Sequence, residues 1–163
     1  MHVLVVVPTY QEADNVAVLL RAVRRAMPDA SVLVLDDASP DGTGALAEEV
    51  GAEVGQVTVV HRRAKEGLGA AYREGFAWAL AHDVDVVVQM DCDLSHDPQV
   101  IPDLVRRLDQ PGDPVECVIG SRYVPGGGWS APTMLRPSND ALGQTIASNP
   151  AGQAIAIYRQ RTG

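Results

Sequence analysis

The segment VVVQMDCDLSHDP, residues 86–98, joins an apolar run to three carboxylates. Valine is β-branched, and an uninterrupted run of it predicts a strand that is buried on both faces of a sheet. Side chains alternate along an extended chain, so Asp91 and Asp93 share one side, roughly 6–7 Å apart along the strand, while Cys92 faces the other. Two like charges held in this way favour a divalent cation beside them. The segment therefore predicts an acidic metal site at the end of a central strand.

The rest of the chain alternates short apolar runs with stretches of helical periodicity. This pattern predicts strands over residues 3–7, 31–35, 57–61, 84–90 and 117–119, and helices over residues 16–27, 45–50, 70–82 and 99–108. In the third helix the predicted buried side is formed by Tyr72, Phe76, Ala79 and Leu80. Repeated strand–helix–strand units predict an α/β fold, in which a mainly parallel, Rossmann-like sheet is flanked by helices.

Length and charge narrow the classes of protein. A chain of 163 residues with 46% apolar residues is long enough for one compact domain. Its formal net charge of −8 argues against binding nucleic acid or anionic lipid through bulk electrostatics. The two cysteines, Cys92 and Cys117, have no metal or redox spacing and suit reduced thiols. Because the apolar run near the start is too short for a signal peptide or a membrane span, we expect a soluble cytoplasmic protein.

Polar residues follow each predicted strand, where parallel sheets bind their ligands. They form a mostly acidic rim with a few cations: Thr9, Tyr10, Glu12, Asp36, Asp37, Asp41, Arg62, Arg63, Lys65, Asp91, Asp93 and Arg122. Two carboxylates about 4 Å apart repel by about 4 kcal/mol at an effective dielectric near 20. A nucleoside-diphosphate sugar with Mg²⁺ or Mn²⁺ relieves this repulsion, because the metal bridges the acids to the diphosphate. The rim therefore predicts an acidic donor site that binds an anion through a metal.

Several rim residues have both a functional and a structural interpretation. After the first strand, Tyr10 suits stacking on a base and Glu12 suits accepting a hydrogen bond, or Glu12 only favours the start of a helix. Asp37 suits contact with a ribose or a base, whereas Asp41 fits a turn. Arg122 is a candidate for binding the leaving diphosphate, with an exposed arginine as the alternative. His96 is interpreted as a loop histidine.

Five segments together resemble family-2 glycosyltransferases of the GT-A fold, and more narrowly the dolichol- or polyprenol-phosphate mannose synthases. They are VVVPTYQEADNV (5–16), VLVLDDASPDGTG (32–44), LGAAYREGFAWAL (68–80), QMDCDLSHDP (89–98) and VIGSRYVPGG (118–127). The resemblance implies metal-assisted transfer of a hexose, above all mannose from GDP-mannose, to a polyprenyl or dolichyl phosphate, with inversion at the anomeric carbon. Such an acceptor phosphate is already anionic and needs no strong general base.

The resemblance also implies roles for individual residues. Nucleotide-sugar binding falls to Pro8, Tyr10, Glu12, Asp37, Asp91, Cys92 and Arg122. The metal falls to Asp91 and Asp93, with Ser95 at the third metal-side position. Asp91, Asp93 and Arg122 form the catalytic set. No residue is expected to become covalently attached to the sugar.

The final part of the chain departs from the family pattern. Residues 1–125 are expected to form the donor-binding catalytic core, and residues 126–163 an atypical or truncated tail in which the apolar patch 155–158 stands alone. One alternative is therefore a truncated copy that binds donors but transfers little. Contact with the inner face of a membrane is expected to be peripheral at most.

A second alternative is a haloacid-dehalogenase-like phosphatase. DCDLS, residues 91–95, fits the DxDx(S/T) motif of these enzymes, with Asp91 as the nucleophile. That motif normally follows the first strand, whereas three strand–helix units precede it here. The position of the motif favours the transferase.

Overall fold

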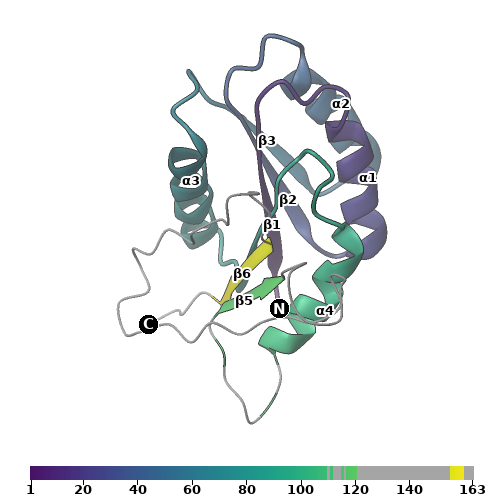
Figure 1. Cartoon of the computed structure of the whole chain (residues 1–163), viewed down its shortest axis with the longest axis vertical. Coiled ribbons are helices and arrows are strands. Elements are labelled where there is room, and N and C mark those ends of the chain that lie inside the picture. The colour runs from purple at the N-terminus through teal and green to yellow at the C-terminus, as the bar shows by residue number, and fades with distance from the viewer. Residues whose placement is uncertain (110, 112–114, 116, 121–154, 160–163) are drawn as a thin grey trace.

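The centre of the molecule is a six-stranded sheet with the strand order β3-β2-β1-β4-β6-β5, seen in a computed structural model (Figure 1). The structure describes residues 1–109, 111, 115, 117–120 and 155–159. The strands are β1 (Val3–Thr9), β2 (Ser31–Asp36), β3 (Val57–His61), β4 (Val86–Gln89), β5 (Cys117–Gly120) and β6 (Ile155–Arg159). Strands β1 to β4 are mutually parallel, and β6 is antiparallel to both of its neighbours. The predicted mainly parallel α/β fold is confirmed.

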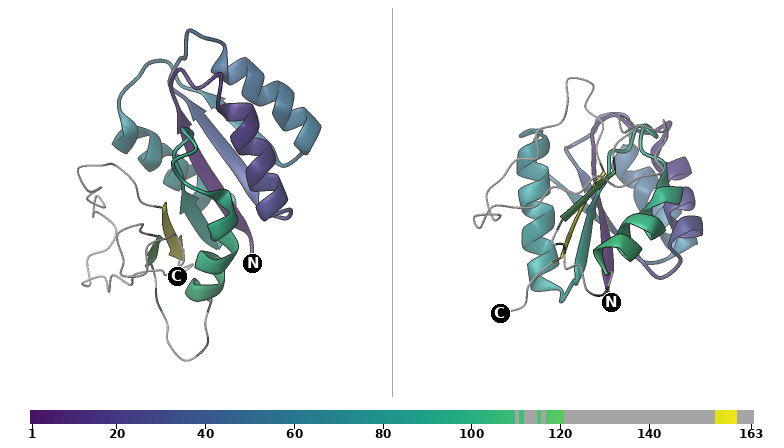
Figure 2. Two further views of the ribbon diagram at one scale, coloured as in Figure 1. Left: turned by 45° about the vertical axis from the view of Figure 1, so that its right-hand side comes forward. Right: turned by 60° about the horizontal axis from the view of Figure 1, so that its bottom comes forward.

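Helices cover both faces of the sheet (Figures 1 and 2). One face carries α1 (Val16–Ala26), α2 (Thr43–Val54) and α4 (Ile101–Leu108), and the other carries α3 (Leu68–Ala81). A 3-10 turn, Pro98–Val100, leads into α4, and the Asp97 side chain caps it by accepting a hydrogen bond from Gln99 N at 2.9 Å. The layers position the carboxyl ends of the parallel strands along one edge.

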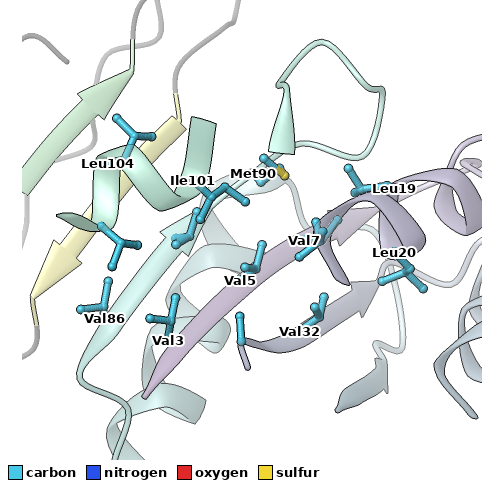
Figure 3. Close-up of a cluster of buried hydrophobic side chains, with 14 of the residues drawn as sticks. Val3, Val5, Val7, Leu19, Leu20, Val32, Val86, Met90, Ile101 and Leu104 are labelled. Atoms are coloured by element: carbon cyan, nitrogen blue, oxygen red, sulfur yellow. The ribbon is translucent and has the colours of Figure 1, made fainter. Parts of the chain in front are cut away.

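Alternation along β1 divides the core in two. Val3, Val5 and Val7 pack with α1, α2 and α4 (Figure 3), whereas Leu4 and Val6 pack with α3. All five side chains are at most 4% exposed. A strand with apolar side chains on both faces is stable only between two helical layers, which is why the valine runs predicted central strands.

The buried side of α3 agrees with the prediction only in part. Ala71, Gly75 and Ala79 form it, while Leu80 is 65% exposed. A side chain at Gly75 would place Cβ only 2.6 Å from Val6 Cγ1, so the helix lies too close to the sheet for a large residue at its centre. Tyr72 and Phe76 are therefore only partly buried, at the margins of this contact.

Gly75→Ala is expected to destabilise the protein by about 1 kcal/mol or more, because overpacking against Val6 outweighs the gain in helix propensity. Gly69→Ala, on the same helix, is the matched control. Its Cβ would meet nothing nearer than Arg73 Nη1 at 3.7 Å, so this change should be neutral or stabilising. Urea denaturation of both variants measures the difference, and equal stabilities would contradict the close packing of α3.

Strand β6 was not predicted. It lies in the expected tail, where the sequence showed only an apolar patch, and it pairs with β4 on one side and β5 on the other. The pairing joins residues far apart in the chain, such as Val86 with Arg159. Local periodicity carries no information about such a partner.

Candidate functional site

The strand pairing of the sheet changes at the carboxyl end of β1. The pairing of β1 with β4 stops at Val6 and Gln89, with Met90 N donating to Val6 O at 3.1 Å, whereas β1 stays paired with β2 as far as Thr9. By strand alternation the Pro8 nitrogen faces the β4 side, beyond the last pair of that ladder. A proline is tolerated there because no ladder hydrogen bond is required of it.

This place is also where the chain order reverses. The chain runs from β1 outward to β2 and β3 and then returns to β4 on the other side of β1. Ligands of open α/β sheets bind at such a reversal, beyond the carboxyl ends of the strands. The loop after β1 carries Tyr10 and Glu12, and the loop after β4 carries Asp91 and Asp93. The predicted donor and metal residues thus flank one position in the sheet.

The loop after β4 is held by its own side chains. Asp91 N donates to His96 Nδ1 at 3.0 Å, and Ser95 N donates to Asp93 Oδ1 at 2.9 Å. Tyr72 of α3 donates its hydroxyl proton to Asp91 Oδ1 at 3.3 Å. Within the loop, Leu94 adopts a left-handed backbone with φ 61°. The two aspartates therefore sit on a tightly turned and braced segment.

The two carboxyl groups titrate differently. Burial, followed by the neighbouring charge of Asp93, raises the pKa of Asp91 above its usual value, and His96 and Tyr72 only partly oppose this. At Asp93 burial also acts to raise the pKa, but hydrogen bonds from Ser95 outweigh it and the pKa is lowered. A bound cation would favour ionised Asp91 next to ionised Asp93.

Cys92 lies between the aspartates but faces the core. It is 2% exposed within the cluster under α1 and α4. Burial raises the pKa of its thiol, and the charges of Glu12, Asp93 and Asp91 raise it further. The loops after β1 and β4 themselves leave neighbouring parallel strands.

Of the second acidic pair, Asp36 and Asp37, the carboxylate of Asp37 is neutralised by a buried ion pair. The Asp37 side chain is 7% exposed and forms an ion pair with Arg62, whose side chain is 5% exposed. Arg62 also donates to Glu74 at 2.8 Å and to Glu66 at 3.1 Å. Arg62, Glu66 and Glu74 also border a cavity of about 340 Å³, whose other lining residues are His61, Arg63 and Ala64. The repulsion expected at Asp37 is thus relieved by an arginine of the chain itself.

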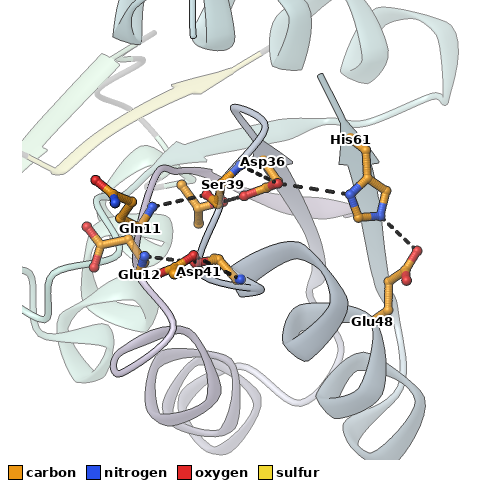
Figure 4. Close-up of polar contacts among 9 residues, drawn as sticks. Gln11, Glu12, Asp36, Ser39, Asp41, Glu48 and His61 are labelled. Carbon is orange, nitrogen blue, oxygen red and sulfur yellow. Dashed lines mark hydrogen bonds and ion pairs between the residues drawn. The ribbon is translucent and has the colours of Figure 1, made fainter. Parts of the chain in front are cut away.

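Asp36 is held differently, by neutral groups. Its carboxylate, 3% exposed as a residue, accepts hydrogen bonds from Thr9 Oγ1 and Ser39 N, each at 3.2 Å. His61 Nδ1 lies 4.0 Å from it and His61 Nε2 lies 3.0 Å from Glu48 (Figure 4). Asp36 therefore links β1, β2 and β3 below the rim.

The residues after β4 fit a hard divalent cation. Asp91 and Asp93 supply carboxylate oxygens, and the buried Ser95 Oγ lies close enough to Asp93 to help lower the pKa of that carboxyl. Within the described part of the chain, no group of three or more His, Cys, Asp or Glu side chains is placed to hold a metal. Magnesium-type ions commonly take one or two carboxylates together with substrate phosphates and water. The set suits an ion shared with a ligand better than a closed structural site.

Other predicted residues have the following places. Tyr10 is half-buried, and Lys65 Nζ lies 3.7 Å from the centre of its ring. Glu12 is also half-buried and accepts a hydrogen bond from Asn15 Nδ2 at 2.7 Å. Arg122 lies outside the described residues.

Sequence reasoning missed two residues that contact Asp91. His96 was interpreted as a loop histidine but is 1% exposed and accepts a hydrogen bond from the Asp91 backbone. Tyr72 was assigned to the core side of α3, whereas its hydroxyl reaches the Asp91 carboxylate. The signal available for Tyr72 was that α3 connects two parallel strands, β3 and β4. Such a helix starts at the edge of the sheet where both strands end, so its first turns lie near the carboxyl end of β4.

The sequence matches a known protein family and resembles individual proteins of known function. The family model described as Glycosyl transferase family 2 matches residues 4–157. The undecaprenyl-phosphate mannosyltransferase of Micrococcus luteus is 47% identical over 78% of this chain and 51% of its own length. The polyprenol monophosphomannose synthase of Mycolicibacterium smegmatis is 49% identical over 76% of this chain and 46% of its own length.

A solved structure resembles the fold as well. The mannosyltransferase PcManGT from Pyrobaculum calidifontis, in complex with GDP-Man and Mn²⁺, superimposes with a TM-score of 0.59 and 27% identity. The match covers 71% of this chain and 34% of that protein. The chain thus spans about half the length of the Micrococcus and Mycolicibacterium proteins. In the described part of the chain, no helix is both long and apolar enough to cross a membrane.

Proposed function

This chain belongs to glycosyl transferase family 2 and has the GT-A fold, and on that premise we propose that it transfers mannose from GDP-mannose to a polyprenyl phosphate. The observation that carries the proposal is that β1 and β4 are neighbouring parallel strands, so that the loop with Tyr10 and Glu12 and the loop with Asp91 and Asp93 leave the same edge of the sheet. The names of the relatives, a polyprenol monophosphomannose synthase and an undecaprenyl-phosphate mannosyltransferase, support the acceptor class.

Donor binding in this proposal uses the loops after β1, β2 and β4. Pro8 sets the path of the chain at the end of β1, Tyr10 contacts the base and Glu12 accepts a donor hydroxyl or N–H. Asp37, already paired with Arg62, contributes an oriented carboxylate to the ribose or the base. Cys92 contributes only through its backbone, because its thiol is in the core.

Asp91 and Asp93, with Ser95 beside them, would hold Mg²⁺ or Mn²⁺. When bound, such an ion stabilises the negative charge that develops on a departing diphosphate. The Mn²⁺ in the PcManGT complex with GDP-Man supports this assignment. Arg122 is proposed to add a positive charge at the same diphosphate.

The acceptor needs little activation. A lipid phosphate is anionic at neutral pH and attacks the anomeric carbon directly, which inverts that centre in a single displacement. We assign the donor-binding core to residues 1–125. A polyprenyl acceptor lies in a membrane, so the chain would meet the cytoplasmic surface peripherally.

The proposal is tested by measuring two reactions separately with the purified chain. Hydrolysis of GDP-mannose and transfer of mannose to polyprenyl phosphate are each followed with Mn²⁺ and with EDTA. We expect metal-dependent transfer that exceeds hydrolysis. Metal-dependent hydrolysis without transfer would instead support the truncated donor-binding copy, and transfer that is unchanged in EDTA would count against the metal.

The phosphatase alternative is not favoured. Its motif belongs after the first strand of a sheet, whereas residues 91–95 follow β4, and the family match spans residues 4–157. Detection of an aspartyl-phosphate on Asp91 would restore it.

A further inference from the structure

Three consecutive backbone N–H groups after β1 are bound by side chains of the segment that joins β2 to α2 and of the first residue of α2. The N–H groups of residues 11, 12 and 13 donate to Ser39 Oγ at 3.0 Å, Thr43 Oγ1 at 2.9 Å and Asp41 Oδ2 at 3.2 Å (Figure 4). We call Ser39, Asp41 and Thr43 the loop clamp. Consecutive amides at a turn otherwise point to water or to a ligand. Here all three are already satisfied by one neighbouring segment.

The acceptors of the clamp are themselves oriented. The Thr43 hydroxyl donates to Asp41 Oδ1 at 2.6 Å, so its lone pairs remain for the N–H of Glu12. Thr43 N donates to the same Asp41 oxygen at 3.1 Å, and Ser39 N donates to Asp36 Oδ2 at 3.2 Å. The Thr43 side chain above all holds the pKa of Asp41 below its usual range, so that Asp41 stays an anionic acceptor.

The clamped loop has an unfavourable backbone. Gln11 has φ 59° and Ala38, in the opposing loop, has φ 55°, both in the left-handed region that residues with side chains avoid. Such a conformation persists only where the surrounding structure fixes it, and it concentrates at functional sites. The loop clamp fixes Gln11 through two hydrogen bonds. Ser39 accepts from the N–H of Gln11, and Thr43 accepts from the N–H of the next residue.

We propose that Ser39, Asp41 and Thr43 are positioning residues for the donor site. They order the loop that carries Tyr10 and Glu12 before the donor arrives, so that binding does not have to pay for that ordering. This inference rests on the proposed function, because it takes Tyr10 and Glu12 to contact the donor. It also changes the interpretation of Asp41, which acts on the neighbouring loop as well as on its own turn.

Calorimetric titration of GDP-mannose in the presence of Mn²⁺ measures the effect. Asp41→Ala and Thr43→Val should each raise the Kd about tenfold, as expected for the loss of a charged or buried hydrogen bond. Because the Thr43 hydroxyl also donates to Asp41, the two losses are coupled, and the double variant should lose less than the product of the two single effects. Thr43→Ser keeps the hydroxyl and should bind within about twofold of the wild type.

Asp14→Ala is the matched control. Asp14 is an exposed carboxylate next to the same loop, and no hydrogen bond or ion pair of its side chain is found among the described residues. The change removes the same charge as Asp41→Ala without removing a clamp contact. Its Kd should stay within about twofold of the wild type.

A second readout does not depend on the donor. In the free protein, amide hydrogen exchange of residues 11–13 should accelerate in Asp41→Ala and Thr43→Val, while the melting temperature stays near that of Asp14→Ala. Unchanged exchange and unchanged Kd in both clamp variants would overturn the inference, as would a Kd that rises equally in Asp14→Ala. If the wild type itself fails to bind GDP-mannose, the proposed function fails, and exchange alone then decides whether the clamp orders the loop.

Discussion

Asp91→Asn is expected to weaken the binding of GDP-mannose in the presence of Mn²⁺ by about a hundredfold or more, equivalent to about 2.7 kcal/mol. Asparagine preserves the shape of the side chain and can still accept the Tyr72 hydrogen bond, but it removes one of two negative charges offered to the ion. Asp103→Asn, in the exposed Arg106 ion pair of α4, removes the same charge elsewhere and should have no effect on binding.

The same substitution should leave stability intact or raise it. Burial raises the pKa of Asp91 above its ordinary value, so the ionised form is disfavoured in the folded protein. Because protonation is linked to folding, a carboxyl group whose pKa is raised in the folded state lowers the free energy of unfolding as the pH rises through that pKa. A neutral asparagine escapes that loss at pH 7, and its melting temperature should equal or exceed that of the wild type.

Repeating the titration in EDTA separates the metal from the side chain. Wild type and Asp91→Asn should then bind GDP-mannose with equal, weak affinity. An equal loss of affinity with and without Mn²⁺ would mean that Asp91 contacts the donor directly. A fall in melting temperature would mean instead that the carboxylate supports the fold.

Arg62→Met is expected to lower the free energy of unfolding by about 3 kcal/mol, because it leaves the buried Asp37 carboxylate without its partner. For a domain of this size the melting temperature should fall by about 10 °C. Methionine keeps most of the apolar stem, so the loss reports the charge rather than a cavity. Chemical denaturation followed by circular dichroism gives the value.

Two further variants give this prediction its controls. Arg21→Met breaks the ion pair with Glu53, whose side chains are 43% and 59% exposed, and should cost at most about 1 kcal/mol. Asp37→Asn combined with Arg62→Met removes both charges and should recover much of the lost stability. Should Arg62→Met prove no more harmful than Arg21→Met, the buried pair would not be an essential part of the rim.

The sequence predicted the central strands and the place of the acidic loop well. Runs such as residues 3–7 and 86–88 allow only a strand buried on both faces, and strand order then determines which loops share an edge. Alternation also predicted that Cys92 would face away from the two aspartates, and its thiol is in the core. These features follow from local pattern and from rules of connection that hold for the whole fold class.

The side-chain contacts that organise the rim could not be predicted from the sequence. Arg62 was recognised only as one of the three cations that follow the third strand, because which arginine turns inward toward Asp37 depends on packing between β2, β3 and α3. The predicted buried side of α3 was correct for Ala79 and partly for Tyr72 and Phe76, but wrong for Leu80, because helical periodicity gives an apolar stripe but not the distance to the sheet, which Gly75 reveals. The functional assignments of the whole set stay predictions: Pro8, Tyr10, Glu12, Asp37, Asp91, Cys92, Asp93, Ser95 and Arg122.

The antiparallel strand β6 has a consequence for biosynthesis. It covers the edge of β4, yet residues 155–159 leave the ribosome long after Val86–Gln89. A nascent chain that has emerged only as far as β5 therefore presents an apolar strand with unpaired backbone groups, which is a template for association with other chains. Closure of this long-range pairing would be a late and slow event in folding, and chaperone demand during translation should be greatest just before it.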